Sequence, residues 1–404
     1  MRTLEVYLDH NATTPVRPEV AEAMMKASTA DGTFGNPSSV HAVGRAARKA
    51  LSLARISVAE TLGAEPSNVT FTGCGSEAIN LAIKGGYFAA GGGRQHIITT
   101  PVEHSAVLKT ASWLESLGAE VTYVPVDATG MLDPAAVADA MRDNTAIVSI
   151  VHANNEVGTI QPSAEIGAIC RDRGVLFHVD AVQAVGKIPT TLDILNADML
   201  SLSAHKLYGP KGIGALVRRE GVELTPLIHG GGQEQGLRSG TEGVAQVVGL
   251  ATALELAVGE MEEASEQLWA LRKRFIDGLE ELDAVKLNGH PEQTLPHTIN
   301  LAFMYCDGMA LGLNLSMRNI YVSQGSACTA GDMKPSHVLM AMGLSEEGAH
   351  GAVRFSLGRN NTEEEIDYVV GELTGTVKKL RILTAPEDIG KCDENCPCFI
   401  NDGV

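Results

Sequence analysis

The stretch from residue 67 to residue 218 alternates between short apolar runs and segments with helical spacing, and this alternation constrains the fold most strongly. Segments such as SEAINLAIKGGYFA and SAVLKTASWLESLG repeat their apolar residues with the period of a helix. The intervening runs predict strands: NVTFTG, HIITTP, EVTYVPV, TAIVSIVHA, VLFHVDA, ADMLSLSAH and IGALVRR. Such alternation is typical of a mostly parallel sheet flanked by helices. We therefore predict an α/β fold.

The character of the sequence changes near residue 258, and with 404 residues the chain exceeds what one hydrophobic core usually serves. A long helical pattern, broken near Gly259, leads into a second α/β segment with strands at HTINLAF and AVRFSL and a closing helix. We predict a large domain over 15–258 and a small domain made of 1–14 and 259–404. The small domain carries a cysteine-containing loop at about 323–334 and a cysteine-containing tail at 392–398.

Charge and cysteine content limit the classes of function. The formal net charge of −18, from 49 acidic and 31 basic residues, argues against a binder of nucleic acid or of anionic membranes. The start MRTLEVYLDHNATTP lacks an apolar signal-peptide core, and no uninterrupted apolar run is long enough for a bilayer. Seven irregularly spaced cysteines do not suggest a disulfide framework, so we expect a reducing, cytoplasmic location.

Polar and small residues follow five of the predicted strands. In open parallel sheets, ligands bind beyond the carboxyl ends of the strands, so residues at those positions are expected to share a site. The five segments are FTGCGSE, PVEHS, HANNEVG, HVDAVQ and SLSAHKLYGPKG.

Two of these residues suit pyridoxal 5'-phosphate (PLP) chemistry. Lys206 ends an apolar strand, where desolvation favours the neutral amine that a Schiff base needs; the alternative is an ordinary surface lysine. Asp180 also ends a strand, where its carboxylate could hold a pyridinium nitrogen protonated; the alternative is a helix N-cap. Gly75, Ser76, Ser203 and His205 could bind a phosphate, because Gly75 and Ser76 open a helix, although GCGSE lacks the ending of a Walker motif.

In this order, the motifs resemble the fold-type I PLP enzymes, specifically the cysteine desulfurases of the NifS/IscS type within the class V aminotransferases. The resemblance spans nearly the whole chain. It rests on YLDHNATTP, GNPSSVH, FTGCGSEAIN, VEHSAV, HANNEVGTIQP, HVDAVQAVGK, SAHKLYGPKGIGAL, GGGQEQGLRSGTE, GSACTAG and RFSLGRNNTEEEID.

The resemblance implies a role for each matching residue. Lys206 holds PLP covalently, Asp180 pairs with the pyridine nitrogen, Gln183 contacts the ring hydroxyl, and His104 stacks on the ring and moves protons. Asn155 borders the ring and the substrate. The phosphate is bound by Gly75, Ser76, Ser203 and His205, with Thr241 reaching it from the second subunit of a homodimer.

The implied substrate is L-cysteine. Arg354 clamps its carboxylate, a role suited to a planar, bidentate guanidinium. Cys328, among the small residues of QGSACTAGDM, could on its own be an idle surface residue, a metal ligand or a mobile nucleophile. The resemblance makes it the sulfur acceptor: cysteine becomes alanine, and a persulfide on Cys328 passes to iron–sulfur cluster assembly or another acceptor protein.

Alternatives stay open at this point. They are a selenocysteine lyase, an aminotransferase, against which Cys328 argues, and a non-enzymatic cluster scaffold, against which Lys206 argues. No metal site is firmly predicted, although Cys328 could ligate a cluster together with a partner. The tail cysteines Cys392, Cys396 and Cys398 could bind metal, relay sulfur or belong to a disordered end.

The remaining cysteines and two strand histidines favour packing roles over chemistry. We expect Cys74 to be a small buried hydrophobe, although it lies beside the phosphate loop. Cys170, Cys306, His152 and His178 are expected to be satisfied residues of the core or its margin.

Overall fold

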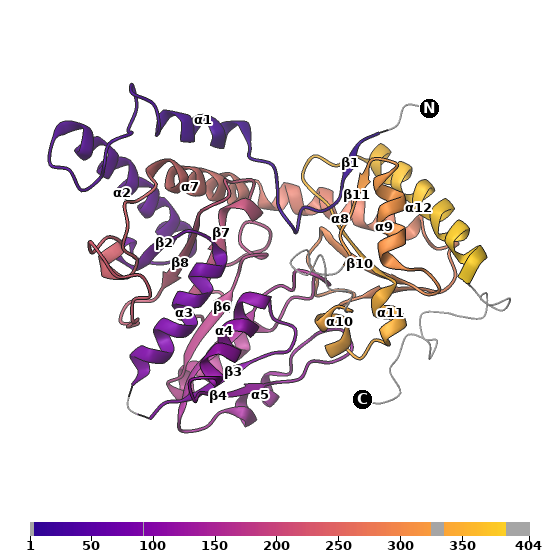
Figure 1. The fold of residues 1–404 in the computed structure, drawn as a ribbon, viewed down its shortest axis with the longest axis horizontal. Coiled ribbons are helices and arrows are strands. Elements are labelled where there is room, and N and C mark those ends of the chain that lie inside the picture. The colour runs from indigo at the N-terminus through magenta and orange to yellow at the C-terminus, as the bar shows by residue number, and fades with distance from the viewer. Residues whose placement is uncertain (1–3, 92, 325–334, 385–404) are drawn as a thin grey trace.

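A seven-stranded sheet organises the larger part of the molecule (Figure 1), within residues 4–91, 93–324 and 335–384, which the computed structural model describes. The strand order is β2-β8-β7-β6-β5-β3-β4, and β8 pairs antiparallel with both neighbours while the other pairs are parallel. The mostly parallel α/β sheet predicted from the sequence is confirmed. Its strands are β2 (Val69–Thr72), β3 (His96–Thr99), β4 (Glu120–Tyr123), β5 (Thr145–Val151), β6 (Leu176–Asp180), β7 (Met199–Ser203) and β8 (Gly214–Arg218).

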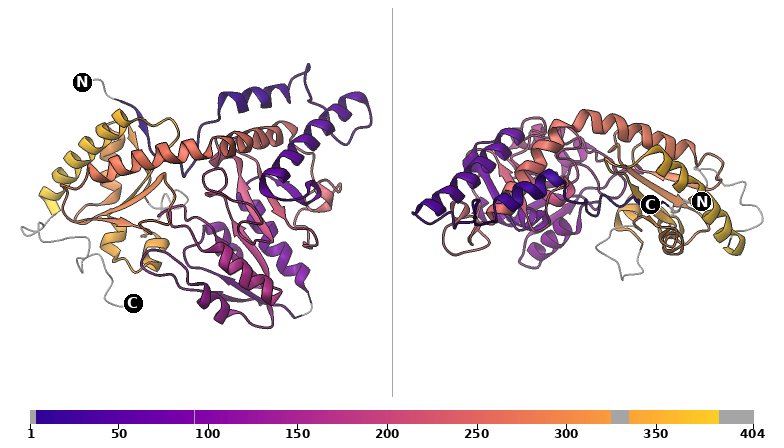
Figure 2. Two further views of the ribbon diagram at one scale, coloured as in Figure 1. Left: turned by 180° about the vertical axis from the view of Figure 1, so that it is seen from behind. Right: turned by 90° about the horizontal axis from the view of Figure 1, so that it is seen from above.

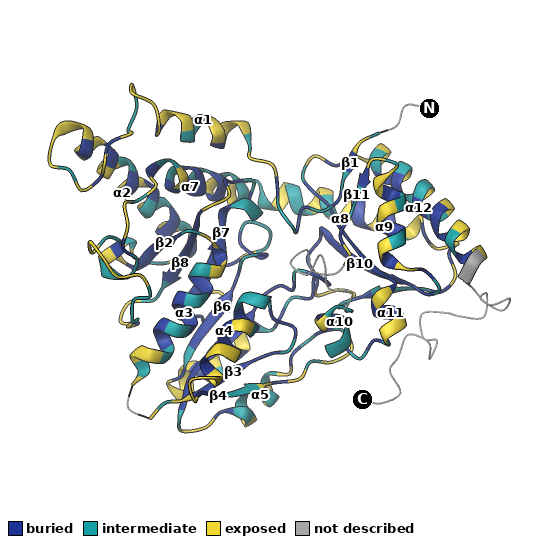
Figure 3. Ribbon diagram, viewed as in Figure 1, coloured by how far each residue is buried: buried dark blue, intermediate teal, exposed yellow. Residues whose placement is uncertain are grey.

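Helices cover both faces of this sheet because successive strand residues point to opposite sides. Ile97 and Met199 contribute to the core beneath α3 (Gly75–Ala90) and α4 (Ser105–Glu115). Their neighbours Ile98 and Leu200 belong to the opposite core, and Figure 3 shows the buried strands between the outer helices. The helices on that opposite side are α2 (Ala42–Leu62), α5 (Pro134–Ala140), α6 (Ser163–Arg173) and α7 (Val244–Gly259), with α1 (Pro18–Lys26) against α7.

A second, smaller unit has its own sheets and core. The antiparallel order β12-β10-β9 and the parallel pair β1-β11 form its strands, so the N-terminal strand joins the C-terminal part of the chain. The predicted strands at HTINLAF and AVRFSL are confirmed; the domain boundary at residue 258 stays a prediction. The strands are β1 (Val6–Tyr7), β9 (Val285–Asn288), β10 (Thr298–Phe303), β11 (Ile320–Tyr321) and β12 (Ala352–Ser356). The helices are α8 (Met261–Asp277), α9 (Gly308–Ser316), α10 (His337–Ala341), α11 (Glu346–His350) and α12 (Glu363–Thr384).

The two units are joined by α7 and α8, which Figure 2 shows running along the molecule from one unit to the other. The helices meet at a bend of 67°, which confirms the break expected near Gly259. Glu260 at the joint binds Arg17 at 2.7 Å and Arg359 at 2.8 Å, and so links the joint to both ends of the chain. Among the described residues, no single helix is long and apolar enough to cross a bilayer. Only α7 and α8 taken together, as a bent pair, have that length and composition.

Candidate active site

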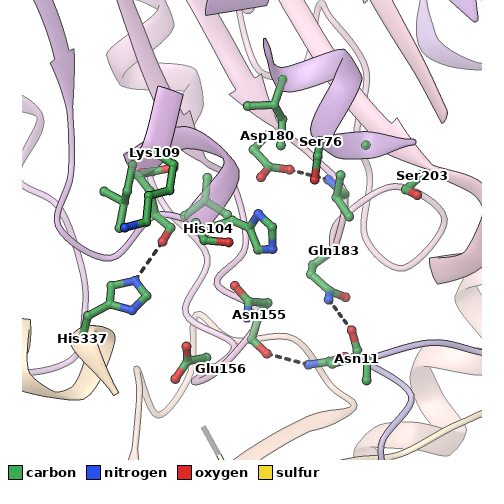
Figure 4. A pocket seen from close by; sticks show the side chains of 18 of the residues that line it. Asn11, Ser76, His104, Lys109, Asn155, Glu156, Asp180, Gln183, Ser203 and His337 are labelled. Atoms are coloured by element: carbon green, nitrogen blue, oxygen red, sulfur yellow. Dashed lines mark hydrogen bonds between the residues drawn. The ribbon is translucent and has the colours of Figure 1, made fainter. Parts of the chain in front are cut away.

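A pocket of about 830 Å³ lies where the carboxyl ends of the large sheet's parallel strands face the small unit. Figure 4 shows its polar side chains directed toward a common space, with Asn11 hydrogen-bonded to Gln183 and Asn155. Segments from five strand ends and from the small unit therefore converge as the sequence predicts. The predicted site residues that line the pocket are Gly75, Ser76, His104, Asn155, Asp180, Gln183, Ser203, His205, Lys206 and Arg354.

The N-terminus of α3 opens into the pocket without a side-chain cap. Its N-cap residue, Cys74, makes no capping hydrogen bond, whereas Glu77 bonds back to the Gly73 amide at 2.7 Å. Gly75 is closely packed, because a Cβ there would lie 3.1 Å from Val182 and 3.2 Å from Ser203, so that these side chains would have to shift by a few tenths of an ångström. Uncapped amides at the positive end of a helix suit an anion.

Asp180 lies at the end of β6, almost fully buried. Its carboxylate accepts the Val182 amide at 3.0 Å. Burial raises the pKa of Asp180, while the nearby His104 opposes that rise. A buried carboxylate is stabilised by a cation or by a donor, so the floor of the pocket favours a ligand with a positively charged N–H.

The His104 ring is held in one tautomer by its capping role. As N-cap of α4, its Nδ1 accepts the Ala106 amide at 3.1 Å, which places the hydrogen of the neutral ring on Nε2. Burial lowers the pKa of His104, while Asp180 opposes that change. In this tautomer Nε2 can donate a hydrogen bond, and a further proton can be taken up only at Nδ1, which would break the cap.

Lys206 follows β7 in a short 3-10 turn and is partly buried, as expected. Its Nζ donates to the main-chain oxygens of Asn11 and of Ala12, the latter at 2.8 Å. Asn11 is held in turn by its Nδ2, which donates to Thr298 Oγ1 at 2.8 Å. The N-terminal segment thus positions the lysine amine, a role that the motif YLDHNATTP did not disclose.

Arg354, on β12, is the small unit's main contribution and is 2% exposed. Its Nη1 donates to the Asn155 main-chain oxygen at 2.9 Å and its Nη2 to Asp9 at 2.8 Å. Among the described residues no partner is found for its Nε. A buried guanidinium with donor capacity left over is suited to a carboxylate ligand.

Sequence reasoning missed several residues that border or support the pocket. Glu103 is fully buried and accepts the Thr100 hydroxyl at 2.7 Å, and its main-chain oxygen contacts His337 Nε2 at 3.0 Å. Ser336 donates to Glu156 at 2.5 Å. The available signal in the sequence was an acidic residue next to a predicted site residue: Glu103 precedes His104, and Glu156 follows Asn155. Their burial, which is rare for carboxylates, is seen only in the structure.

Five residues predicted from the sequence do not line this pocket in the described part of the structure. Thr241 is exposed and lines a second hollow of about 300 Å³ together with Phe34 and Asn36, so its reach into another subunit stays a prediction. Cys328 lies outside the described residues, and so do Cys392, Cys396 and Cys398. Within the described part of the chain no cluster of three potential metal ligands is found.

One packing prediction is wrong and four are confirmed. Cys74 is exposed at the pocket, because the extended backbone before α3 turns it out of the core. Cys170 and Cys306 are buried. His152 contacts Ser163 Oγ at 2.9 Å, and His178 joins the hydroxyls of Ser149 and Ser201, each at 2.8 Å.

The residues present fit PLP. The uncapped start of α3 suits its phosphate, the buried Asp180 carboxylate suits its ring nitrogen, and Lys206 supplies an amine to the same pocket. Burial lowers the pKa of His205 to about 4, so beside the phosphate position this ring is neutral and can donate a hydrogen bond. Its Nδ1 contacts Thr13 Oγ1 at 3.1 Å.

Comparisons with known proteins agree with this site. The family described as Aminotransferase class-V matches residues 6–369. The chain is 50% identical over 379 residues to "Cysteine desulfurase IscS" of Methanosarcina thermophila, covering 94% of this chain and 93% of the relative. A solved "NIFS-LIKE PROTEIN" is 42% identical with a TM-score of 0.87, over 94% of this chain and 100% of that one. A structure titled "SspA in complex with cysteine" is 41% identical with a TM-score of 0.78, over 88% and 100%. The chain belongs to the class V aminotransferase family, among the cysteine desulfurases of the NifS/IscS type.

Proposed function

We propose that this protein is a PLP-dependent cysteine desulfurase, which converts L-cysteine to L-alanine and receives the sulfur on Cys328 as a persulfide. The observation that carries the proposal is one pocket holding Lys206, Asp180 and Arg354 together. An amine, a partner for a ring nitrogen and a carboxylate clamp are what PLP chemistry on an amino acid needs. The names of the relatives support cysteine as that amino acid.

The side chains of the pocket have separate tasks in this proposal. Arg354 binds the substrate carboxylate through donor capacity that the described residues leave unused. PLP, held covalently by Lys206, supplies an electron sink that stabilises negative charge at the substrate Cα. The Lys206 amine, once released, takes the Cα proton. Asn155 and Gln183, both in contact with Asn11, border the ligands from the strand ends of the large sheet.

Sulfur transfer needs no further reagent. The Cys328 thiolate attacks the substrate sulfur, so that an S–S bond forms and the Cβ–S bond breaks. The electron pair of the broken Cβ–S bond remains with the substrate Cβ, which becomes a methyl group after taking up a proton. The Cys328 sulfur is oxidised and the substrate carbon is reduced, so atoms and electrons balance. Acceptor proteins, such as those of iron–sulfur cluster assembly, then take the persulfide sulfur.

The described residues that flank Cys328 support its access to the pocket. Ser323 exchanges main-chain hydrogen bonds with Arg354 at 3.1 and 2.8 Å, and Ser336 and His337 line the pocket. The five-residue step from Ser323 to Cys328 spans at most about 17 Å. A thiol carried there can therefore meet a substrate held by Arg354.

The proposal includes a cytoplasmic homodimer in which Thr241 reaches the phosphate of the partner's pocket. It is supported by the position of Thr241, which is exposed and lines a hollow apart from its own chain's pocket. Large apolar side chains are also exposed near this hollow, with Phe34 55% and Met25 60% exposed. Such surfaces commonly mark contacts between proteins.

Three cysteine variants test the assignment, with alanine, persulfide and the visible band of the bound cofactor measured together. Cys328→Ala should keep the band and lose persulfide and sulfide release, while the buried Cys306→Ala should behave as wild type. Lys206→Ala should lose the normal band. Persulfide that persists in Cys328→Ala but disappears in Cys74→Ala would assign the acceptor role to the exposed cysteine in the pocket.

A further inference from the structure

Lys187 is a titratable residue behind the pocket that the proposed reaction does not use. It does not line the pocket; its Nζ donates to Gln183 Oε1 at 2.8 Å. Gln183 is 4% exposed, lines the pocket, and donates through Nε2 to the Asn11 main-chain oxygen at 2.9 Å. The amide therefore lies between a lysine on one side and a main-chain carbonyl on the other.

These two partners permit only one orientation of the Gln183 amide. A charged lysine amine has donors and no acceptor, and a carbonyl oxygen has no donor. If the amide were flipped, its NH2 group would face the ammonium of Lys187 and its oxygen would face the oxygen of Asn11. Both contacts would be repulsive in a buried site, where an unsatisfied polar group costs about 1 to 3 kcal/mol.

We propose that Lys187 is a positioning residue that fixes Gln183 with an N–H donor facing the cofactor's ring oxygen. This inference rests on the proposed function, because the orientation of the Gln183 amide matters for the reaction only if PLP binds in the pocket. One Nε2 hydrogen is used by Asn11 and the other remains for the ligand. Asn11 also accepts from Lys206, so Lys187 and Lys206 are connected through a single carbonyl oxygen and one amide.

The surroundings of Lys187 are predominantly cationic. Burial, together with the positive charges of Lys206 and Arg354, lowers the pKa of its amine to about 7. His10 and His297 face the same region, and the pKa of each is lowered by burial, with Lys187 contributing. Near neutral pH the amine is therefore divided between its charged and neutral forms, and it is the charged form that excludes the flipped amide.

In the proposed role, the correctly oriented Gln183 N–H stabilises an anionic ring oxygen. When this donor turns away, the bound cofactor keeps its proton to a higher pH. The holoenzyme's visible band changes with pH, and the midpoint of that change is the readout, measured without substrate. Lys187→Met should raise the midpoint by about half a unit or more, whereas Lys378→Met, at an exposed lysine of α12, should leave it unchanged.

Two further variants separate positioning from a direct effect of charge. Lys187→Gln keeps a donor amide without the charge, so its midpoint should stay near that of wild type. In a Gln183→Leu background, Lys187→Met should produce no further shift. An equal shift in that background, or a Lys187→Gln midpoint that matches Lys187→Met, would overturn the positioning role in favour of direct charge.

The remaining outcomes also decide. An unshifted, folded Lys187→Met with a normal wild-type band would refute the assignment and leave the proposed function standing. A wild-type protein that shows no band after PLP is added would instead refute the proposed function. If Lys187→Met fails to fold by circular dichroism, Lys187→Ala replaces it as the variant without a donor: a raised midpoint in Lys187→Ala together with an unshifted Lys187→Gln supports the proposal, and equal midpoints in the two variants contradict it.

Discussion

Glu103 provides the most quantitative prediction, because the fold keeps this acid in a site that disfavours its charge. The side chain is fully buried; Oε1 accepts the Thr100 hydroxyl, and among the described residues Oε2 has no partner. Burial, aided by the nearby Asp180 carboxylate, raises the pKa of Glu103 from its usual 4.5 to about 8. We predict that Glu103→Gln removes a pH-dependent loss of stability.

The sign and size follow from the pKa difference. The unfolded chain releases the proton near pH 4.5, while the folded protein holds it until about pH 8. The folded state therefore binds more protons throughout this window, and stability falls as the pH rises through it. With about 1.36 kcal/mol for each unit, the cost grows from about 1 kcal/mol at about pH 5 to about 3 kcal/mol at about pH 7.

Urea unfolding of wild type and Glu103→Gln at these two pH values, at equal protein and cofactor concentrations, tests this. The stability of the variant relative to wild type should improve by about 2 kcal/mol from about pH 5 to about pH 7. Glu266→Gln, at an exposed position of α8, should show no such change. The reasoning fails if the stability difference between Glu103→Gln and wild type is the same at both pH values.

Two further substitutions give independent tests. Asp9→Asn removes the carboxylate that binds Arg354 Nη2 at 2.8 Å, and should raise the KM for cysteine about tenfold with a smaller effect on kcat; an unchanged KM in steady-state assays would contradict the clamp. Gly214→Ala places a Cβ 2.7 Å from the main chain of Cys74, just before α3, and should cost about 1 to 3 kcal/mol and weaken PLP retention in thermal unfolding and dialysis. Gly259→Ala, where a Cβ meets no atom within 4 Å, is its control and should change stability by less than about 0.5 kcal/mol.

Strand ends were predictable because hydrophobic periodicity and chain direction determine them. Gly75, His104, Asp180 and Lys206 each follow a strand that the pattern predicts, and parallel strands bring such residues to one edge. The arrangement of these residues could therefore be predicted from local sequence patterns and from the rule that ligands bind at the carboxyl ends of parallel strands.

Other features depend on contacts between distant segments, which local patterns do not encode. The raised pKa of Glu103 arises from its burial and from the nearby Asp180 carboxylate. Lys187 is linked to the pocket only through Gln183, which binds Asn11. Cys74 was expected to be buried because cysteine usually is, yet the extended backbone before α3 exposes it. Composition and periodicity contain no information on such tertiary placement.

The N-terminal segment has a consequence for how the protein matures. The Asn11 amide donates to Ser356 Oγ at 2.9 Å, across 345 residues, and Asp9 pairs with Arg354 over the same separation. Residues 9–11 thus complete the pocket only with residues that the ribosome makes about 345 positions later. A growing chain lacks the clamp and the support of the lysine amine until β12 has emerged. Stable capture of PLP should therefore be restricted to chains made at least through β12, so that the cofactor distinguishes them from chains that stop before it.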